Sequence, residues 1–291
     1  VSFLCNLYTD LSTKNYDSTT LQNEIKTYIG SLHFNVETYA DVNNNKDCIP
    51  MLVVNMSVLE ENTKKAEKLV LEILTNTIFD NKERMKEVVL QNEMMAKQYI
   101  ITGGRNIAMY VTGSHYSSAG VANEVTHGYT YLHWITTFAK NFDTMYEGFM
   151  KVINKVNTSL GRKRLTLSVT TSTDKNVTDF IANFPEGKVV NETPKYTSTL
   201  PKKMGIKIPA QVSYAVMSHN LKEQNIAYNG SLRLLSHIAT FSYLWDEVRV
   251  QGGAYGTGMD CARGGTFHTH SYRDPSPERS LDVYRKVADF I

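Results

Sequence analysis

Two hydrogen-bond donors of different chemistry stand six residues apart within residues 244–259. Arg249 carries a permanently charged guanidinium at the end of an apolar helical pattern, and Tyr255 carries a phenol at the start of an extended segment. Because Gly252 and Gly253 separate them, the backbone can turn so that both side chains face one point. A guanidinium and a phenol placed in this way can donate hydrogen bonds to a substrate carbonyl or to a developing oxyanion.

A plainer role fits the same two residue types. A cation near the C-terminus of a helix interacts favourably with the helix dipole, so Arg249 can act as a cap. Tyr255 can pack its ring against the sheet that the extended segment joins. Residue type alone favours this structural role, and the surrounding sequence must decide between the two.

The histidine pair His268 and His270 is a candidate metal site. Two residues apart in an extended segment, the side chains point to the same side, as two ligands of one ion can. No third ligand stands nearby, and the sequence contains neither HExxH nor HxxEH. Because a His-Thr-His run also forms the polar face of a half-exposed strand, we predict no metal site in this chain.

Signals for nucleophilic catalysis and for phosphate binding are weak. The sequence has no GxSxG motif, and none of Cys5, Cys48 and Cys261 has a neighbouring base. The glycine-rich run 252–258 follows a helix and opens a strand, which is the reverse of the order that places a helix N-terminus against phosphate. We therefore predict no bound cofactor in this chain.

Composition excludes several partners. The formal net charge is +2 and both signs are interspersed, which does not favour nucleic-acid binding. The apolar runs are far shorter than the ~20 residues that span a bilayer, so no membrane partner is predicted. Three separated cysteines without CxxC spacing favour a reducing compartment, the cytoplasm or another intracellular one.

Four of the seven prolines fall between residues 185 and 209 and indicate a linker. On each side of it the chain shows the order helix, glycine, strand, turn, strand, helix. This order predicts an α+β fold of two homologous domains, 1–184 and 210–291, each a mostly antiparallel sheet covered by helices. Apolar helical stripes run up to both ends of the chain, so both domains are expected to be truncated.

Apolar periodicity locates the main elements. Alternation predicts strands at 31–39, 50–59, 165–169, 212–216, 254–261 and 266–273. A long helix is predicted from about residue 229 to Gly252. Its spacing places six apolar side chains toward the core: Leu234, Leu235, Ile238, Phe241, Trp245 and Val248.

Two motifs resemble one known family. They are Arg249-x-x-Gly252-Gly253-Ala254-Tyr255-Gly256 and Ser271-Tyr272-Arg273-Asp274-Pro275. Together they resemble the C-terminal half of insulinase/pitrilysin-type zinc metallopeptidases, in the branch of presequence proteases and falcilysin. The resemblance extends over the whole chain.

The resemblance implies an architecture and a division of roles. Members of this family have four homologous α+β domains in two halves, which close around a chamber and degrade unfolded peptides. Residues 1–184 would be the third domain and 210–291 the start of the last. In the family, the N-terminal half holds zinc through an inverted HxxEH helix and a distal Glu. The C-terminal half contributes an Arg and a Tyr, which correspond to Arg249 and Tyr255.

The resemblance also implies that zinc is bound outside this chain. Phe3, Asn6 and Leu7 stand where the active domain of the family has its HxxEH residues. The whole protein would be a metalloendopeptidase, and this chain alone would be inactive. Its partners would be the N-terminal catalytic half, in the same polypeptide or in another subunit, and unfolded peptides. The alternative is a non-catalytic scaffold or partner subunit of the same fold, similar to the core proteins of respiratory complexes.

Overall fold

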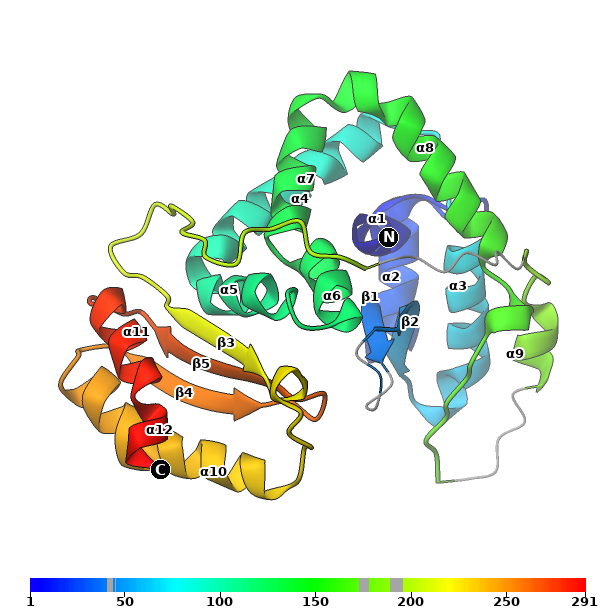
Figure 1. Cartoon of the computed structure of the whole chain (residues 1–291). Coiled ribbons are helices and arrows are strands. Elements are labelled where there is room, and N and C mark those ends of the chain that lie inside the picture. Colours follow the sequence, from blue (N-terminus) through cyan, green and yellow to red (C-terminus); the bar gives the residue numbers. More distant parts are fainter. Residues whose placement is uncertain (41–43, 45, 173–177, 189–195) are drawn as a thin grey trace. The chain divides into compact units, whose positions relative to one another are not determined.

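A computed structural model describes residues 1–40, 44, 46–172, 178–188 and 196–291, and it combines helices with antiparallel β-structure (Figure 1). The predicted α+β class is therefore confirmed. None of the helices within these residues is long and apolar enough to cross a membrane.

The chain packs into two compact units. Unit 1 comprises Val1–Val36, Leu52–Asn92 and Thr136–Pro194, and unit 2 comprises Glu37–Met51, Glu93–Ile135 and Lys195–Ile291. These units reflect packing, whereas the predicted domains 1–184 and 210–291 concern ancestry and stay a prediction. Part of the predicted linker 185–209, including Pro194, lies outside the described residues.

Unit 1 is built mainly of helices. Its own helices are α1 (Ser2–Asp10), α2 (Ser18–Tyr28), α3 (Thr63–Asn76), α8 (Phe142–Ser159) and α9 (Thr178–Asn183), with the 3₁₀ turns η1 (Glu60–Asn62) and η2 (Arg162–Arg164). Four elements contribute residues to both units: β1 (Ser31–Ala40), β2 (Cys48–Ser57), α4 (Lys82–Thr102) and α7 (Tyr129–Lys140).

Local sequence explains how unit 1 begins. The carboxylate of Asp17 accepts a hydrogen bond from Thr20 N at 2.9 Å, which satisfies a free N–H of the first turn of α2. Leu21 on this helix is fully buried. In β1 the alternating residue Val36 is buried, as the period of two predicts. A predicted cap and a predicted strand are therefore confirmed here.

One predicted strand is wrong. Leu165, Leu167 and Val169 alternate, yet the structure has no strand over these residues, and Leu167 and Val169 are exposed. Alternation produces a strand only where a neighbouring strand pairs with its N–H and C=O groups, and no such neighbour occurs among the described residues. The loop expected before residue 126 is also helical, since α6 (Ser118–His127) begins at a cap where Ser117 Oγ accepts from Gly120 N.

The sheet of unit 2 has three antiparallel strands in the order β3-β5-β4. They are β3 (Val216–Asn220), β4 (Gly256–Cys261) and β5 (Thr266–Tyr272). The register places Ser218 opposite His268, and His268 opposite Asp260. The first strand starts later than the predicted 212–216, because in that stretch only Ser213 pairs, in an isolated bridge with Asp274.

Helices flank this sheet (Figure 1). α5 (Gly104–Gly113) contacts β3 and β5, and Thr112 accepts a hydrogen bond from Ser218 Oγ at 2.6 Å. α10 (Ser231–Ala239), the π-helix η4 (Thr240–Val250), α11 (Pro277–Arg285) and α12 (Val287–Phe290) form the other helical part, and η3 (Leu221–Gln224) follows β3. The apolar core between these helices and the strands consists of Ala215, Ala239, Leu244, Val248, Ala254, Val283, Tyr284 and Val287.

The long helix before Gly252 does not bury the predicted face. Leu234, Ile238 and Phe241 are 61%, 44% and 57% exposed, whereas Leu244 and Val248 are fully buried. The physical reason is that the helix continues as η4, whose i→i+5 hydrogen bonding widens each turn and shifts the phase of the apolar stripe. A pattern based on a period of 3.6 residues therefore selects the wrong side beyond Ala239.

Core substitutions can test this assignment. Leu244→Ala should lower the free energy of unfolding by about 2–5 kcal/mol, because a fully buried leucine is lost and a cavity remains. Phe241→Ala should cost less than about 1 kcal/mol because the ring is largely exposed. Denaturant unfolding followed by circular dichroism measures both. A larger cost for Phe241→Ala than for Leu244→Ala would restore the regular helix.

Candidate functional site

The corner between η4 and β4 is built around two glycines. Gly253 has a φ of +79°, which side-chain-bearing residues rarely adopt. Its N–H donates to the Arg249 carbonyl at 3.1 Å, and Ala254 N donates to the Val248 carbonyl at 3.1 Å. A Cβ on Gly252 would lie 2.5 Å from the Val248 carbonyl oxygen. The sequence thus turns sharply where the helix ends, as the glycine pair predicts.

A different arginine caps the helix. Arg279 of α11 donates through Nη1 to the carbonyl oxygen of Glu247, and its Nη2 lies 3.1 Å from the Glu247 carboxylate. This contact satisfies a carbonyl of the last turn and places a cation near the C-terminus of the helix. The cap proposed for Arg249 under the structural alternative is therefore occupied by Arg279.

Arg249 points instead toward the start of β4. Its Nε donates to the carbonyl oxygen of Tyr255 at 3.0 Å, and its guanidinium carbon lies 4.3 Å from the centre of the Trp245 ring. The hydrogen bond and the cation–π contact hold the planar group on two sides. Within the described residues no hydrogen bond occupies its terminal nitrogens. The guanidinium is thus held in place with donors to spare.

Tyr255 does not pack its ring into the sheet. The residue is 69% exposed, and its ring makes an edge-on contact with Tyr272 at 6.1 Å between ring centres. Its backbone N–H donates to the Tyr272 carbonyl at 3.0 Å. The structure therefore brings Arg249 to the backbone of Tyr255 and leaves the phenol accessible. The convergence of guanidinium and hydroxyl on one substrate oxygen stays a prediction.

A buried aspartate fixes the segment that faces Tyr255. Asp274 is fully buried and accepts hydrogen bonds from Ser271 Oγ at 2.6 Å and from Ser276 N at 2.8 Å. The turn that it organises holds Arg273 at a φ of +49°, with its guanidinium 5.7 Å from the centre of the Tyr272 ring. The sequence marks this stretch through the Ser271–Pro275 motif, but it does not reveal that Tyr272 and Arg273 lie beside Tyr255.

Comparison with known proteins identifies the family. A family model for a peptidase-associated domain matches residues 1–138, and the model described as PreP C-terminal domain matches residues 203–291. Proteins named presequence protease are similar to this chain over most of its length. The chain belongs to the presequence-protease branch of the insulinase/pitrilysin family.

Individual relatives of this presequence-protease-like chain are distant. It is 28% identical over its whole length to Protein HypA of Clostridium perfringens. It is 29% identical over 75% of its length to presequence protease 1, chloroplastic/mitochondrial, of Arabidopsis thaliana, and 26% identical over 97% to the mitochondrial presequence protease of Saccharomyces cerevisiae. The chain spans 30%, 21% and 30% of the lengths of these three proteins.

A solved structure shares the fold of the presequence-protease-like chain. The crystal structure of a conserved protein from Enterococcus faecalis V583 matches with a TM-score of 0.55 at 12% identity. The match covers 99% of this chain and 69% of the other.

The residues at the family's zinc-ligand positions do not fit a metal here. Phe3 and Leu7 of α1 are buried in the core of unit 1, and Asn6 donates its side-chain amide to Asn92. Two apolar side chains and one committed amide provide none of the His, Cys or carboxylate donors that zinc takes. In the part of the chain that the structure describes, no group of three His, Cys, Asp or Glu residues could hold a metal ion.

The histidine pair of β5 has separate partners within the protein. His268 Nδ1 lies 2.7 Å from Ser218 Oγ, and His270 Nε2 lies 3.1 Å from the carboxylate of Asp260. Burial lowers the pKa of His268 to about 4, although Asp260 opposes this shift. The same hydrogen bond to His270 lowers the pKa of Asp260. These contacts join strands and α5 and give the pair a structural role.

The lowered pKa of His268 predicts a pH-dependent stability. Between pH 6.5 and about 4 the unfolded chain binds a proton that folded His268 does not, so the stabilising effect is complete above pH 6.5 and is lost as the pH falls. The loss should be on the order of 2 kcal/mol, allowing for partial exposure.

Urea unfolding at several pH values measures this slope. His268→Gln should flatten it, whereas His219→Gln, at an exposed position of β3, should leave it unchanged. The same slope in both variants would show that another group is responsible.

Proposed function

We propose that this chain is part of a zinc-dependent endopeptidase, and that Arg249 and Tyr255 donate hydrogen bonds to the carbonyl oxygen of the peptide bond that is cleaved. One observation carries the proposal. Arg249 is held by Trp245 and by the carbonyl of Tyr255 through a single nitrogen, so its terminal nitrogens stay available beside the exposed phenol.

Electrostatics explains why such an arrangement would accelerate cleavage. Negative charge grows on the carbonyl oxygen as the attacked carbon becomes tetrahedral. Donors that are already fixed in position stabilise this charge without reorganising at that moment. The packing against Trp245 and the sharp corner at Gly253 fix the Arg249 donor before substrate arrives.

The remainder of the enzyme would lie outside this chain. The chain spans 30% or less of the relatives described above, which is consistent with a partner that supplies the other half of the site. We propose that the N-terminal half of the enzyme binds zinc, and that the two halves enclose unfolded peptides in a chamber. Arg249 and Tyr255 would contribute from the side of the chamber that this chain forms.

Removal of the Tyr255 hydroxyl tests the role of the phenol. Tyr255→Phe, made in the full-length polypeptide, should lower kcat for peptide cleavage by about a hundredfold, because one donor to the oxyanion contributes roughly 3 kcal/mol. The melting temperature and the metal content should not change, since the exposed ring is kept.

A matched control separates this effect from a general one. Tyr228→Phe removes a hydroxyl elsewhere in unit 2 and should leave kcat unchanged. If Tyr255→Phe cleaves as fast as the unaltered protein, the catalytic role is refuted and a scaffold role becomes the better account.

Metal analysis tests the division of roles. The 291-residue chain alone should hold no stoichiometric zinc and cleave no peptide, because Phe3, Asn6 and Leu7 cannot act as ligands. Measurement by plasma mass spectrometry after gel filtration with added zinc gives the metal content. One tightly bound zinc per chain would contradict the proposal and direct attention to His268 and His270.

A further inference from the structure

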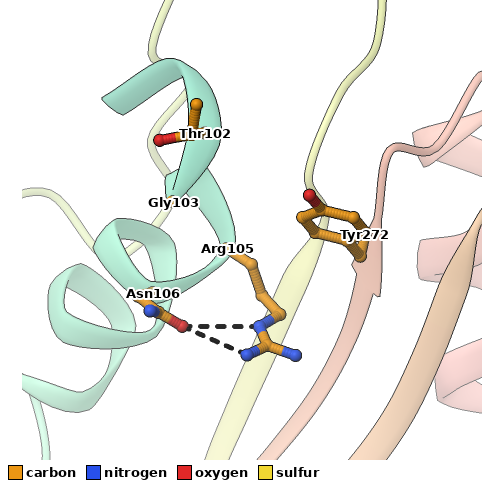
Figure 2. A pocket seen from close by; sticks show the side chains of 5 residues that line it. All are labelled: Thr102, Gly103, Arg105, Asn106 and Tyr272. Carbon is orange, nitrogen blue, oxygen red and sulfur yellow. Dashed lines mark hydrogen bonds between the residues drawn. The ribbon is translucent and has the colours of Figure 1, made fainter. Parts of the chain in front are cut away.

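A small cavity lies beside the proposed donors. It has a volume of about 250 Å³ and is lined by Thr102, Gly103, Arg105, Asn106 and Tyr272 (Figure 2). Tyr272 forms one side, and Arg105 extends from α5 on the other. Because the Tyr272 ring also meets the edge of Tyr255, the cavity adjoins the surface where the peptide would bind.

Unneutralised positive charge surrounds this cavity. Arg105 lines it, Arg273 lies over the Tyr272 ring, and Arg249 contacts the backbone of Tyr255. Among the described residues, none of these three guanidinium groups forms a salt bridge. The positive charge of Arg105 helps lower the pKa of Asp260, but that carboxylate is paired with His270. Three unpaired cations near two tyrosine rings favour an anionic ligand.

Arg105 is the donor best placed to bind that ligand. Its Nε and Nη2 share one acceptor, Asn106 Oδ1, at 3.4 and 3.3 Å. Both distances exceed the usual range for N–H···O bonds, so the guanidinium has no strong partner. A carboxylate accepts two parallel bonds from this planar fork at shorter distances. The side chain is half-buried, so solvent screens such a pair less than it would on an open surface.

We propose that the cavity between Arg105 and Tyr272 is a subsite for a carboxylate group of the bound peptide. This inference rests on the proposed peptidase function and names Arg105 as a specificity-determining residue. The volume holds several waters, so it suits an acidic side chain or a C-terminal carboxylate better than a large group. Tyr272 gives the subsite an apolar wall, and Arg273 and Arg249 add to its positive potential.

Binding measurements with matched peptides test the subsite. One fluorescent peptide pair differs by Glu or Gln at a single position, and a second pair differs by a free or an amidated C-terminus. Dissociation constants are measured by fluorescence anisotropy on the full-length protein treated with a metal chelator, which prevents zinc-dependent cleavage during the measurement. The pair that shows a preference identifies which carboxylate the subsite binds.

The expected preference is about tenfold for the carboxylate-bearing member of at least one pair, as for one hydrogen-bonded charge pair. Arg105→Gln should abolish this preference, and Arg105→Lys should retain part of it because the charge remains. Arg263→Gln removes the same charge from the turn between β4 and β5, at the far end of the hairpin from Tyr255 and Tyr272, and should keep the preference.

The outcomes separate this subsite from the proposed catalytic role. Equal binding within both peptide pairs, or an unchanged preference in Arg105→Gln, would overturn the subsite even if Tyr255→Phe abolishes cleavage. Loss of the preference in Arg105→Gln together with unchanged cleavage by Tyr255→Phe would support the subsite and refute the catalytic role. Circular dichroism of each variant shows whether the fold is kept, and Arg105→Lys supports the comparison if Arg105→Gln does not fold.

Discussion

The i→i+5 hydrogen bonding of η4 determines where Arg249 points. Near its end, Gln251 N–H donates to the carbonyl of Asp246 at 2.9 Å, so each turn takes up more residues than in an α-helix. Leu244 and Val248 are buried in this widened helix, and their packing fixes its rotation about its own axis. Arg249 is the next residue after Val248, so the same packing directs it away from the core and toward the first residues of β4.

Two buried groups hold the opposite sides of the surface around Tyr255. On one side, Val248 fixes the helix end, and Arg279 occupies its carbonyl groups. On the other side, Asp274 organises the turn that presents Tyr272 and Arg273. The exposed residues therefore depend on partners that never meet solvent. Rigid support beneath accessible donors is the condition under which hydrogen bonds aid catalysis, because loosely held donors must first reorganise.

Local sequence signals predict those parts of the fold and of the site whose causes are local. The Asp17 cap and the turn at Gly253 each depend on a few neighbouring residues. The strand assigned to residues 165–169 failed because a strand needs a partner that alternation cannot supply, and the i→i+5 bonding of η4 has no marker in residue type. Arg105 comes from α5, far away in the sequence, and no local pattern connects it with Tyr272. Residues that join a site through tertiary packing are thus the ones that a single sequence does not reveal.

The first helix shows why this chain could lose metal ligands and still keep its fold. Phe3 and Leu7 are almost completely buried, and zinc-binding side chains at these positions would place polar groups in the core of unit 1. Burial of a polar group without a partner costs several kcal/mol, and a bound metal would have to offset that cost. With apolar residues there, the helix stabilises the unit directly. Any chemical contribution of the chain must then come from elsewhere, and the corner at Gly252 and Gly253 presents held donors to solvent.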